Sequence, residues 1–396
     1  MARISERMLA LGTAPSEIRD AFTFARQRAA VVGADKVDDF SIGNPSVPAP
    51  DCVADAVHAL LTEQDPVQLH GYTPAQGDAA VRQTLAEDLN ARFGTTYGGD
   101  ALYLTCGAAG ALCCALSALA CPGDEFVVIA PYFPEYAVFI GSAGGTLVEV
   151  PARQADFQPD LTALAAALNE RTKAVLINSP NNPTGAVYSP ETLTALAALL
   201  RERSEQYGHP IWLLSDEPYR EIYYGDGQLP WVPSYYADTL VCYSYSKSLS
   251  LPGERLGWVL TPDGAADAPL VRAAVAGAGR ALGYVCAPSL FQFVAARCLG
   301  ATADISVYRR NRDLLLGALR RYGYTCAPAD GAFYLFPETP EPDARAFCQR
   351  ARALDLVLVP GDSFGGPGHV RISYCVPTEQ IERSLWKFEK LMQSYR

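Results

Sequence analysis

Between about residues 100 and 260 the chain alternates short apolar runs with longer stretches of helical periodicity. Most of the apolar runs are continuous rather than alternating, which is typical of strands buried on both faces of a sheet. The predicted strands are Ala101–Leu104, Glu125–Ala130, Thr146–Val150, Ala174–Ile177, Ile211–Leu214, Thr239–Tyr243 and Gly257–Leu260. The predicted helices between them include Ala108–Leu119, Leu161–Leu168 and Glu191–Gln206. This alternation predicts an α/β fold with a mostly parallel sheet between helices.

The rest of the chain indicates a second, smaller domain, and 396 residues are enough for two. A charged helical stretch runs from about Ser289 to Arg321, and short strands are predicted at Gly331–Phe336, Leu356–Val359 and Val370–Tyr374. The first forty residues are predicted to be helical, without strands. We therefore expect an N-terminal segment (1–45) that packs with a small α+β domain (291–396), and a large domain (46–290).

Composition narrows the possible partners and location. The net charge of −11 disfavours binding to nucleic acid or to anionic lipid. No apolar stretch is long enough for a membrane span, and residues 1–20 lack the pattern of a secretory signal, so a cytoplasmic location is expected. The count of 11 cysteines is odd. Cys106, Cys113, Cys114 and Cys121 are read as core residues near a buried helix, and no metal site is predicted.

Polar groups follow several predicted strands, where a buried parallel sheet binds its ligands. These segments are Thr105–Gly110, Asn178–Gly185, Ser215–Tyr219 and Ser244–Ser248. The Gly107–Gly110 segment is either an ordinary helix entry or a phosphate-binding helix start. Asp216 is either a turn cap or a functional carboxylate. Lys247 is the most informative residue, because a lysine at the end of a buried strand is desolvated and becomes a usable nucleophile.

The motifs of other cofactors are missing from the sequence. It contains no G-x-G-x-x-G after a strand, no G-x-x-x-x-G-K-[ST] and no G-x-S-x-G. What remains is a lysine, an aspartate, an arginine (Arg255) and a helix-start phosphate cradle. This set matches pyridoxal 5'-phosphate (PLP), which presents an aldehyde, a pyridine nitrogen and a phosphate.

Several motifs occur in one order along the chain: Asn182-Pro183-Thr184-Gly185, Asp216-Glu217-Pro218-Tyr219, Ser244-Tyr245-Ser246-Lys247, Gly253-Glu254-Arg255-Leu256-Gly257 and Gly331-Ala332-Phe333-Tyr334. In this order the chain resembles the PLP-dependent aminotransferases of fold type I, class I/II, similar to aspartate aminotransferase. The resemblance runs from Ser41 to Tyr374.

The resemblance implies a role for each motif residue. Lys247 would form the Schiff base with PLP, and Asp216 would pair with the pyridine nitrogen. The other cofactor contacts that it implies are Asn182 and Tyr219 on the phenolic oxygen, Phe133 on the ring, Ala108, Ala109, Ser244 and Arg255 on the phosphate, and Tyr72 on the phosphate of the partner subunit's site.

For the substrate, the resemblance implies Arg371 as the anchor of the α-carboxylate, with Gly43 and Asn182 beside it. Arg371 could instead form a structural ion pair. Arg280 is a candidate for a second cation that reads an acidic side chain on the partner subunit, although an exposed arginine is the commoner outcome.

The expected function is transamination between an L-amino acid and a 2-oxo acid, in a homodimer with shared sites and with ping-pong kinetics. A PLP-dependent lyase that acts by β- or γ-elimination uses the same cofactor contacts and stays an alternative. A non-catalytic PLP-binding sensor is a third interpretation, which the lack of a basic N-terminal module disfavours.

Overall fold

The computed structural model describes residues 4–395, and the chain divides into two compact units. The larger unit comprises Pro45–Arg309 and Ala327–Phe333, and the smaller unit comprises Met1–Asn44, Arg310–Cys326 and Tyr334–Arg396. Residues 291–309 and 327–333 were expected in the small domain, whereas both stretches belong to the larger unit in this division. Neither unit is therefore one continuous stretch of chain.

The larger unit is built on a seven-stranded sheet within the described residues, with the order β2-β8-β7-β6-β5-β3-β4. Its strands are β2 (Leu102–Thr105), β3 (Glu125–Ala130), β4 (Thr146–Pro151), β5 (Thr172–Asn178), β6 (Trp212–Asp216), β7 (Thr239–Ser244) and β8 (Gly257–Leu260). Strand β8 is antiparallel to both of its neighbours, and the other neighbouring pairs are parallel. The predicted α/β fold with a mostly parallel sheet is confirmed.

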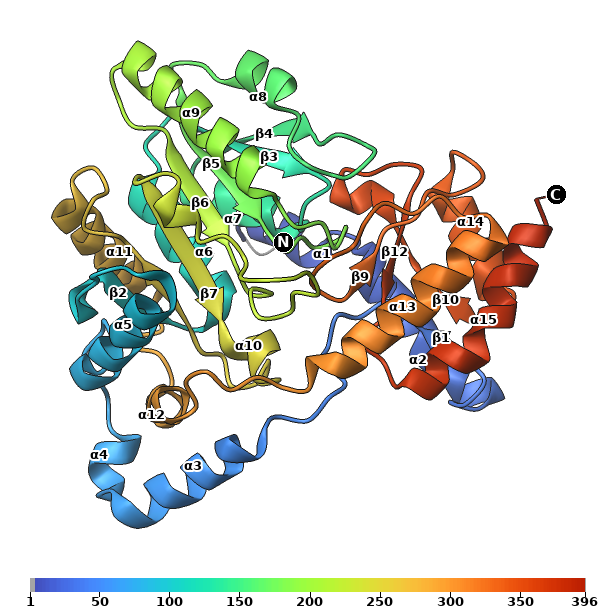
Figure 1. Ribbon diagram of the computed structural model, residues 1–396, viewed down its shortest axis with the longest axis horizontal. Helices are drawn as coiled ribbons and strands as arrows, with labels where there is room; N and C mark the ends of the chain where they lie inside the picture. Colours follow the sequence, from blue (N-terminus) through green and yellow to red (C-terminus); the bar gives the residue numbers. More distant parts are fainter. Residues whose placement is uncertain (1–3, 396) are drawn as a thin grey trace. The chain divides into compact units, whose positions relative to one another are not determined.

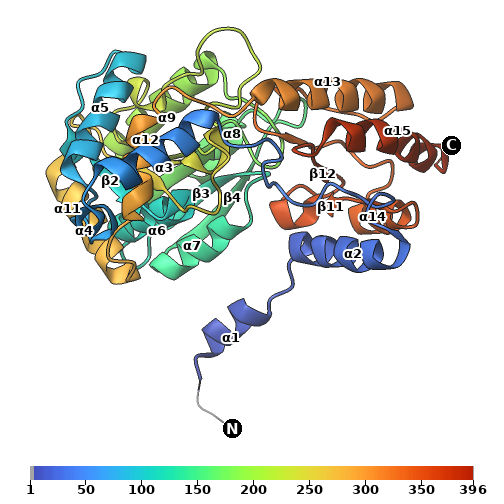
Figure 2. The same cartoon turned by 90° about the horizontal axis from the view of Figure 1, so that it is seen from below.

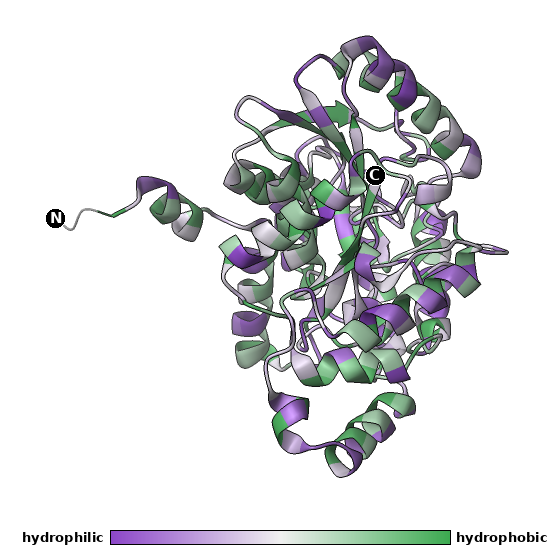
Figure 3. Cartoon of the chain, turned by 90° about the vertical axis from the view of Figure 1, so that its left-hand side faces the viewer, coloured by the Kyte–Doolittle hydropathy of each residue, from purple (hydrophilic) through white to green (hydrophobic). Residues whose placement is uncertain are grey.

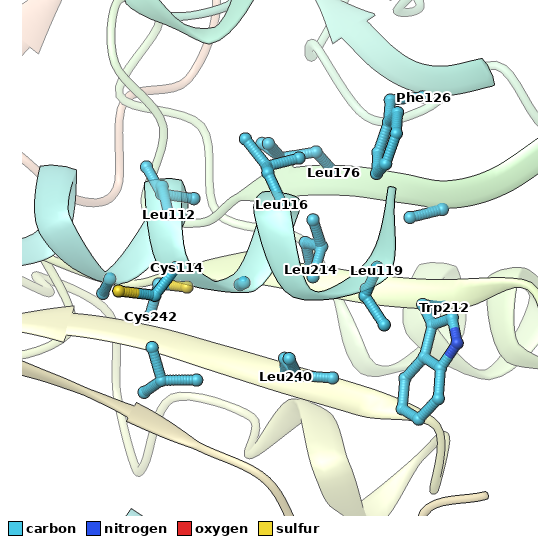
Figure 4. Close-up of a cluster of buried hydrophobic side chains, with 14 of the residues drawn as sticks. Leu112, Cys114, Leu116, Leu119, Phe126, Leu176, Trp212, Leu214, Leu240 and Cys242 are labelled. Atoms are coloured by element: carbon cyan, nitrogen blue, oxygen red, sulfur yellow. The ribbon is translucent and has the colours of Figure 1, made fainter. Parts of the chain in front are cut away.

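Both faces of this sheet are buried, which explains the continuous apolar runs. Along β3, Phe126 and Val128 belong to the core on one face, and Val127 and Ile129 to the core on the other. Figure 4 shows the first core, where Leu116 and its neighbours on the central helix point toward the strands. Side-chain alternation with a period of two therefore sets which residues face which helices.

Helices cover both faces of the sheet (Figure 1). One face packs against α6 (Gly107–Leu119), α7 (Glu135–Ala143) and α11 (Ala268–Leu282). The other packs against α3 (Asp51–Glu63), α5 (Ala79–Phe93), α8 (Leu161–Ala167), α9 (Pro190–Tyr207) and α12 (Ser289–Arg297). Two short helices, α4 (Pro66–His70) and α10 (Tyr245–Ser248), and the 3-10 turns η1 (Gly99–Ala101) and η2 (Val232–Ser234) complete the unit.

Local sequence explains the clearest of these helices. In α9 the Ser189 side chain accepts the N–H of Thr192, Pro190 occupies the first turn, and Gly208 ends the helix in a left-handed conformation. Figure 3 shows hydrophilic and hydrophobic residues on different sides of the surface helices, the pattern of amphipathic packing.

The stretch from Ser289 to Arg321 is not one helix, so that prediction is wrong. Helix α12 ends at Arg297 and α13 (Ile305–Tyr322) begins eight residues later. Between them Gly300 has a φ of +73°, and the N–H of Ala303 donates to the carbonyl of Ser248 at 2.7 Å. The helical periodicity continues through the break, but a left-handed glycine and an outside hydrogen bond interrupt the helix. Cys121 likewise lies beyond α6 and is exposed, whereas Cys113 and Cys114 lie within that helix.

The smaller unit has a two-stranded sheet of β1 (Asp38–Asp39) and β10 (Leu356–Val357) and a three-stranded sheet in the order β11-β12-β9 among the described residues. The strands of the three-stranded sheet are β9 (Tyr334–Leu335), β11 (Val359–Pro360) and β12 (Val370–Ser373). The 3-10 turn η3 (Gly361–Phe364) follows β11 directly. The helices are α1 (Glu6–Thr13), α2 (Glu17–Val32), α14 (Ala344–Arg352), α15 (Thr378–Gln393) and most of α13. In Figure 2 the strands lie between α13 and α15 on one side and α2 and α14 on the other.

Strand β1 contradicts the prediction that the first forty residues lack strands. It escapes the sequence pattern because it consists of two aspartates, Asp38 and Asp39. Asp38 is buried, and its carboxylate is paired with Lys387 at 2.7 Å and with Arg383 at 2.8 Å. Buried charges need such partners, and this pairing is not visible from local sequence. Among the residues described, no helix has the length and apolar character needed to cross a membrane.

Candidate functional site

Three polar residues end three neighbouring strands of the larger unit. Asn178, Asp216 and Ser244 are the last residues of β5, β6 and β7, which are parallel to one another. Each lies an even number of positions after a residue in the core beneath α6, so the alternation of side chains turns all three toward that face. The carboxyl edge of the sheet therefore gathers these groups, as expected for a ligand site.

Asp216 is the most perturbed of these groups. The Tyr136 hydroxyl donates to its Oδ2 at 2.5 Å, and Asn178 Nδ2 donates to its carbonyl oxygen at 2.8 Å. Its other oxygen, Oδ1, is buried without a hydrogen-bond partner among residues 4–395. Burial raises the pKa of Asp216 to about 7, the hydrogen bond from Tyr136 opposes that rise, and the charge of Glu217 adds to it. A buried acceptor oxygen in this state calls for a donor from a ligand.

Lys247 lies in the one-turn helix α10, directly after β7. Ser244 caps this turn, because its Oγ accepts the N–H of Ser246 at 3.1 Å. The Tyr243 hydroxyl donates to Ser248 Oγ at 2.9 Å and fixes the end of the turn. The half-buried Lys247 places its Nζ 5.4 Å from the centroid of the Phe333 ring.

Asn182 and Tyr219, also expected at this site, are both buried. The N–H of Asn182 donates to Asn178 Oδ1 at 2.7 Å. Tyr219 packs edge-on against the ring of Phe333, with centroids 5.4 Å apart. Asn178 therefore links the loop of Asn182 to the backbone of Asp216, and Phe333 contacts both Tyr219 and Lys247.

The helix start expected to bind phosphate is formed between β2 and α6. Helix α6 begins at Gly107, which has a φ of +77°, and its first free N–H groups include those at Ala108 and Ala109. A Cβ at Gly107 would lie 2.8 Å from Arg255 Nη2. Arg255 is exposed and held by carbonyls, with its Nη1 2.8 Å from that of Pro252. The guanidinium of Arg255 therefore lies beside the N-terminus of α6, and both can bind an anion.

Phe133 lies in the loop between β3 and α7 and is half-buried. Its ring packs edge-on against Tyr136, with centroids 5.7 Å apart. Tyr136 in turn contacts Asp216, so the structure links Phe133 to the carboxylate through one side chain.

The residues gathered in the larger unit have the chemistry needed to bind PLP. The orphaned Oδ1 of Asp216 is the acceptor that a pyridinium N–H requires. The space over Gly107, which a Cβ would fill, lies beside the guanidinium of Arg255. The donor set of backbone amides, hydroxyls and arginine suits a phosphate dianion.

Arg371 and Gly43 belong to the smaller unit. Arg371 is buried in β12, with its guanidinium carbon 4.9 Å from the ring centroid of Tyr334 and 4.8 Å from that of Phe364. Its Nη2 donates to the carbonyl of Ser41 at 2.5 Å. A Cβ at Gly43 would overlap the hydroxyl of Tyr334, so this position requires glycine.

Two expected residues lie on the surface of the larger unit. Tyr72 follows α4 and is 89% exposed. Arg280 lies in the last turn of α11 and is exposed. Both were expected to act in the site of a partner subunit, and their roles stay predictions.

Tyr136 and Asn178 both contact Asp216, and neither was assigned a role from the sequence. Asn178 carried a signal, because it is the last residue of a strand next to β6. Tyr136 carried none beyond an aromatic hydroxyl three residues after Phe133, since its partner is 80 residues away in sequence.

Comparison with known proteins identifies the class to which this fold and site belong. The sequence profile of the family described as Aminotransferase class I and II matches residues 35–388. The chain belongs to this family of PLP-dependent transaminases, as the sequence resemblance predicted.

Individual relatives cover nearly the whole chain. A crystal structure of an amino transferase from Eubacterium rectale is 53% identical, with a TM-score of 0.98 and 100% of both chains covered. The aspartate/prephenate aminotransferase of Thermus thermophilus is 32% identical over 88% of this chain and 89% of its own. The valine--pyruvate aminotransferase of Mycobacterium tuberculosis is 33% identical over 95% of this chain and 96% of its own. These comparisons favour transamination over the lyase alternative.

Proposed function

We propose that this transaminase moves an amino group between an L-amino acid and a 2-oxo acid with Lys247 as its reactive amine. The main support for the proposal is that two residues with complementary chemistry lie at the ends of the neighbouring strands β6 and β7. Asp216 ends β6 with an orphaned, buried Oδ1, and Lys247 follows β7 on a fixed helical turn. Asp216 would hold the protonated ring nitrogen of bound PLP, and Lys247 would hold the cofactor through its aldehyde carbon.

The family resemblance implies the cofactor contacts, and the geometry of the larger unit supports them. Asp216 Oδ1 would accept the pyridinium N–H and favour its protonated state. Asn182 and Tyr219 would hold the phenolic oxygen, and Phe133 would lie against the ring face. The N–H groups of Ala108 and Ala109, the hydroxyl of Ser244 and the guanidinium of Arg255 would hold the phosphate.

When bound, PLP supplies an electron sink for the substrate α-carbon. Lys247 Nζ, as the free amine, accepts the proton from that carbon and later returns it. This Nζ lies 5.4 Å from the centroid of the Phe333 ring. The capped turn of α10 fixes the backbone from which the Lys247 side chain reaches toward the substrate.

Arg371 is proposed to bind the substrate α-carboxylate, near Gly43 and with Asn182 also contacting the substrate. A guanidinium matches a carboxylate with two parallel hydrogen bonds. The rings of Tyr334 and Phe364 fix the plane of the arginine before any substrate arrives. The fixed orientation of the Arg371 guanidinium supports its proposed role as the carboxylate anchor.

We also propose a homodimer in which Tyr72 contacts the phosphate of the partner's site. Support comes from a group of exposed apolar residues on two linked segments. Gln292 Nε2 donates to Thr73 Oγ1 at 3.1 Å and to the carbonyl of Ala287 at 2.8 Å, joining the segments. The exposed residues beside them are Val67, Tyr72, Leu282 and Val285. Such a group marks an interaction surface. Sedimentation equilibrium that returns an active monomer would contradict the dimer.

Borohydride reduction tests the central proposal. The holoenzyme is reduced, digested and mapped by mass spectrometry, and the pyridoxyl group is expected on Lys247. A pyridoxyl group on any other lysine would refute the assignment. A screen of amino acids for conversion of the bound cofactor to its amine form, read by absorbance, then identifies the substrate. The cytoplasmic location stays a prediction.

A further inference from the structure

The structure holds a tyrosine that the proposed chemistry does not use. Tyr136 lies in the first turn of α7 and is 1% exposed. Its hydroxyl donates to Asp216 Oδ2 at 2.5 Å. Burial, with the nearby charge of Asp216 as the next cause, holds the pKa of Tyr136 well above its usual value. The phenol therefore stays protonated and remains a hydrogen-bond donor over the working pH range.

The two oxygens of Asp216 are in different environments. Oδ2 accepts the hydrogen bond of Tyr136, and Asn178 Nδ2 is also 3.5 Å from it. Oδ1 has no partner among residues 4–395. A carboxylate can rotate about its terminal bond unless one oxygen is held, because that torsion is broad. The tyrosine fixes which oxygen is left available for a ligand.

Tyr136 also acts on the charge of the carboxylate. Burial disfavours the ionised form of Asp216, and a donated hydrogen bond favours it. The other polar or titratable groups around the pair are Asn178 on β5, Glu217 next in the chain and paired with Arg220, Cys242 on β7, and Tyr188 and Tyr219 beside Tyr136. None of these groups is a cation in contact with Asp216, and the hydrogen bond of Tyr136 is the contact in this set that favours the ionised carboxylate.

We propose that Tyr136 is a positioning residue that acts on the cofactor through Asp216, holding Oδ2 so that an ionised Oδ1 faces the pyridine nitrogen. This inference rests on the proposed function, in which Asp216 pairs with that nitrogen. Tyr136 contacts the carboxylate rather than the substrate or cofactor, so it is not a catalytic residue.

A purely structural role for Tyr136 predicts different behaviour, and the chain offers a matched control. Tyr132, on the loop before α7, is 7% exposed, and its hydroxyl donates to Glu149 at 2.6 Å. Its ring stacks on Tyr136, with centroids 6.3 Å apart. Tyr132→Phe and Tyr136→Phe thus each delete a tyrosine hydroxyl that donates to a carboxylate, but Glu149 is exposed and only Tyr136 contacts the buried Asp216.

The test measures the affinity of the apoenzyme for PLP by titration of fluorescence or absorbance. Tyr136→Phe is expected to raise the dissociation constant about tenfold, since a hydrogen bond to a buried charge is lost. Tyr132→Phe should change it by less than about twofold. The acid-side fall in affinity should also move to higher pH in Tyr136→Phe, because Asp216 then protonates more readily. Far-UV circular dichroism and melting of each apoenzyme check that the fold is kept.

A double variant separates action through Asp216 from packing. In an Asp216→Ala background, Tyr136→Phe should change the affinity no further. An equal loss with Asp216 present and absent would overturn the inference in favour of a structural role. No loss in Tyr136→Phe, while Asp216→Ala binds PLP weakly, would overturn the inference alone. Wild-type affinity in Asp216→Ala would overturn both the inference and the proposed role of Asp216.

Discussion

The most specific test of the phosphate site replaces Gly107 with alanine. Gly107 begins α6 at a φ of +77°, a region that residues with a side chain rarely adopt. A Cβ there would lie 2.8 Å from Arg255 Nη2 and 3.2 Å from its Cζ. The backbone must therefore change its conformation or the guanidinium must move away. Either response disturbs the place where we expect the cofactor phosphate to bind.

The expected losses of stability and of PLP affinity come from the backbone strain at residue 107 and from the displacement of Arg255. A left-handed conformation costs an L-residue roughly 1–2 kcal/mol, which lowers the free energy of unfolding of the apoenzyme. A hydrogen bond between charged groups contributes about 1.5–3 kcal/mol. If Arg255 no longer reaches the phosphate, PLP affinity falls roughly tenfold to a hundredfold. The affinity for pyridoxal, which has no phosphate, should change little.

Gly110 provides the matched control in the same helix. A Cβ at Gly110 would lie 3.6 Å from the Cβ atoms of Cys106 and Thr105, which is ordinary contact. Gly110→Ala should keep PLP affinity and stabilise the helix by roughly 0.5–1 kcal/mol. The assay is titration of each apoenzyme with PLP and with pyridoxal. Equal loss of both ligands in Gly107→Ala, or wild-type binding of PLP, would refute the phosphate cradle.

Three further predictions concern the charged groups. The pKa of Asp216 is raised from 3.8 to about 7, so this group destabilises the apoenzyme as pH rises through that window. Asp216→Asn should become more stable than wild type by up to about 4 kcal/mol above pH 7 and by less near pH 5; a constant difference in urea unfolding would contradict this. Arg371→Lys should raise the Michaelis constant for the amino acid and leave the cofactor spectrum intact, because lysine cannot bind a carboxylate with a planar fork; an unchanged constant excludes the anchor. If Arg280 reads an acidic side chain in the partner's site, Arg280→Leu should lower kcat/KM for acidic amino acids far more than for neutral ones; equal effects would show that it does not.

The larger unit was predictable because its signals are local. Glu125–Ala130 and Gly257–Leu260 were predicted with the bounds that the structure has, since both are continuous apolar runs between clear breaks. The antiparallel direction of β8 was not predicted, because strand direction depends on pairing across the sheet. The break between α12 and α13 depends on Ala303, which bonds to Ser248 some 55 positions earlier in the chain.

The residues of the candidate site also fall into those that local sequence predicts and those that it does not. Lys247, Asp216 and Gly107 follow predicted strands, so their gathering at one edge of the sheet could be inferred from the order of elements. The contacts of Tyr136 with Asp216 and of Phe333 with Lys247 could not be inferred, because both depend on tertiary packing between residues far apart in the sequence. Strand β1 was missed for a related reason, since its Asp38 is buried only through Lys387 and Arg383 at the other end of the chain.

Residues 327–333 belong to the larger unit although they follow a segment of the smaller unit in the chain, and this order has a consequence for biosynthesis. Phe333, which contacts Lys247 and Tyr219, is translated 86 residues after Lys247 (from 247 to 333). At bacterial or eukaryotic elongation rates of about 5–20 residues per second, this delay is roughly 4 to 17 seconds. During that time the nascent larger unit lacks the ring that lies 5.4 Å from Lys247 Nζ. A chain terminated at Arg309 would keep Lys247 yet never complete this site, so the ribosome must synthesise part of the smaller unit before the larger one is whole.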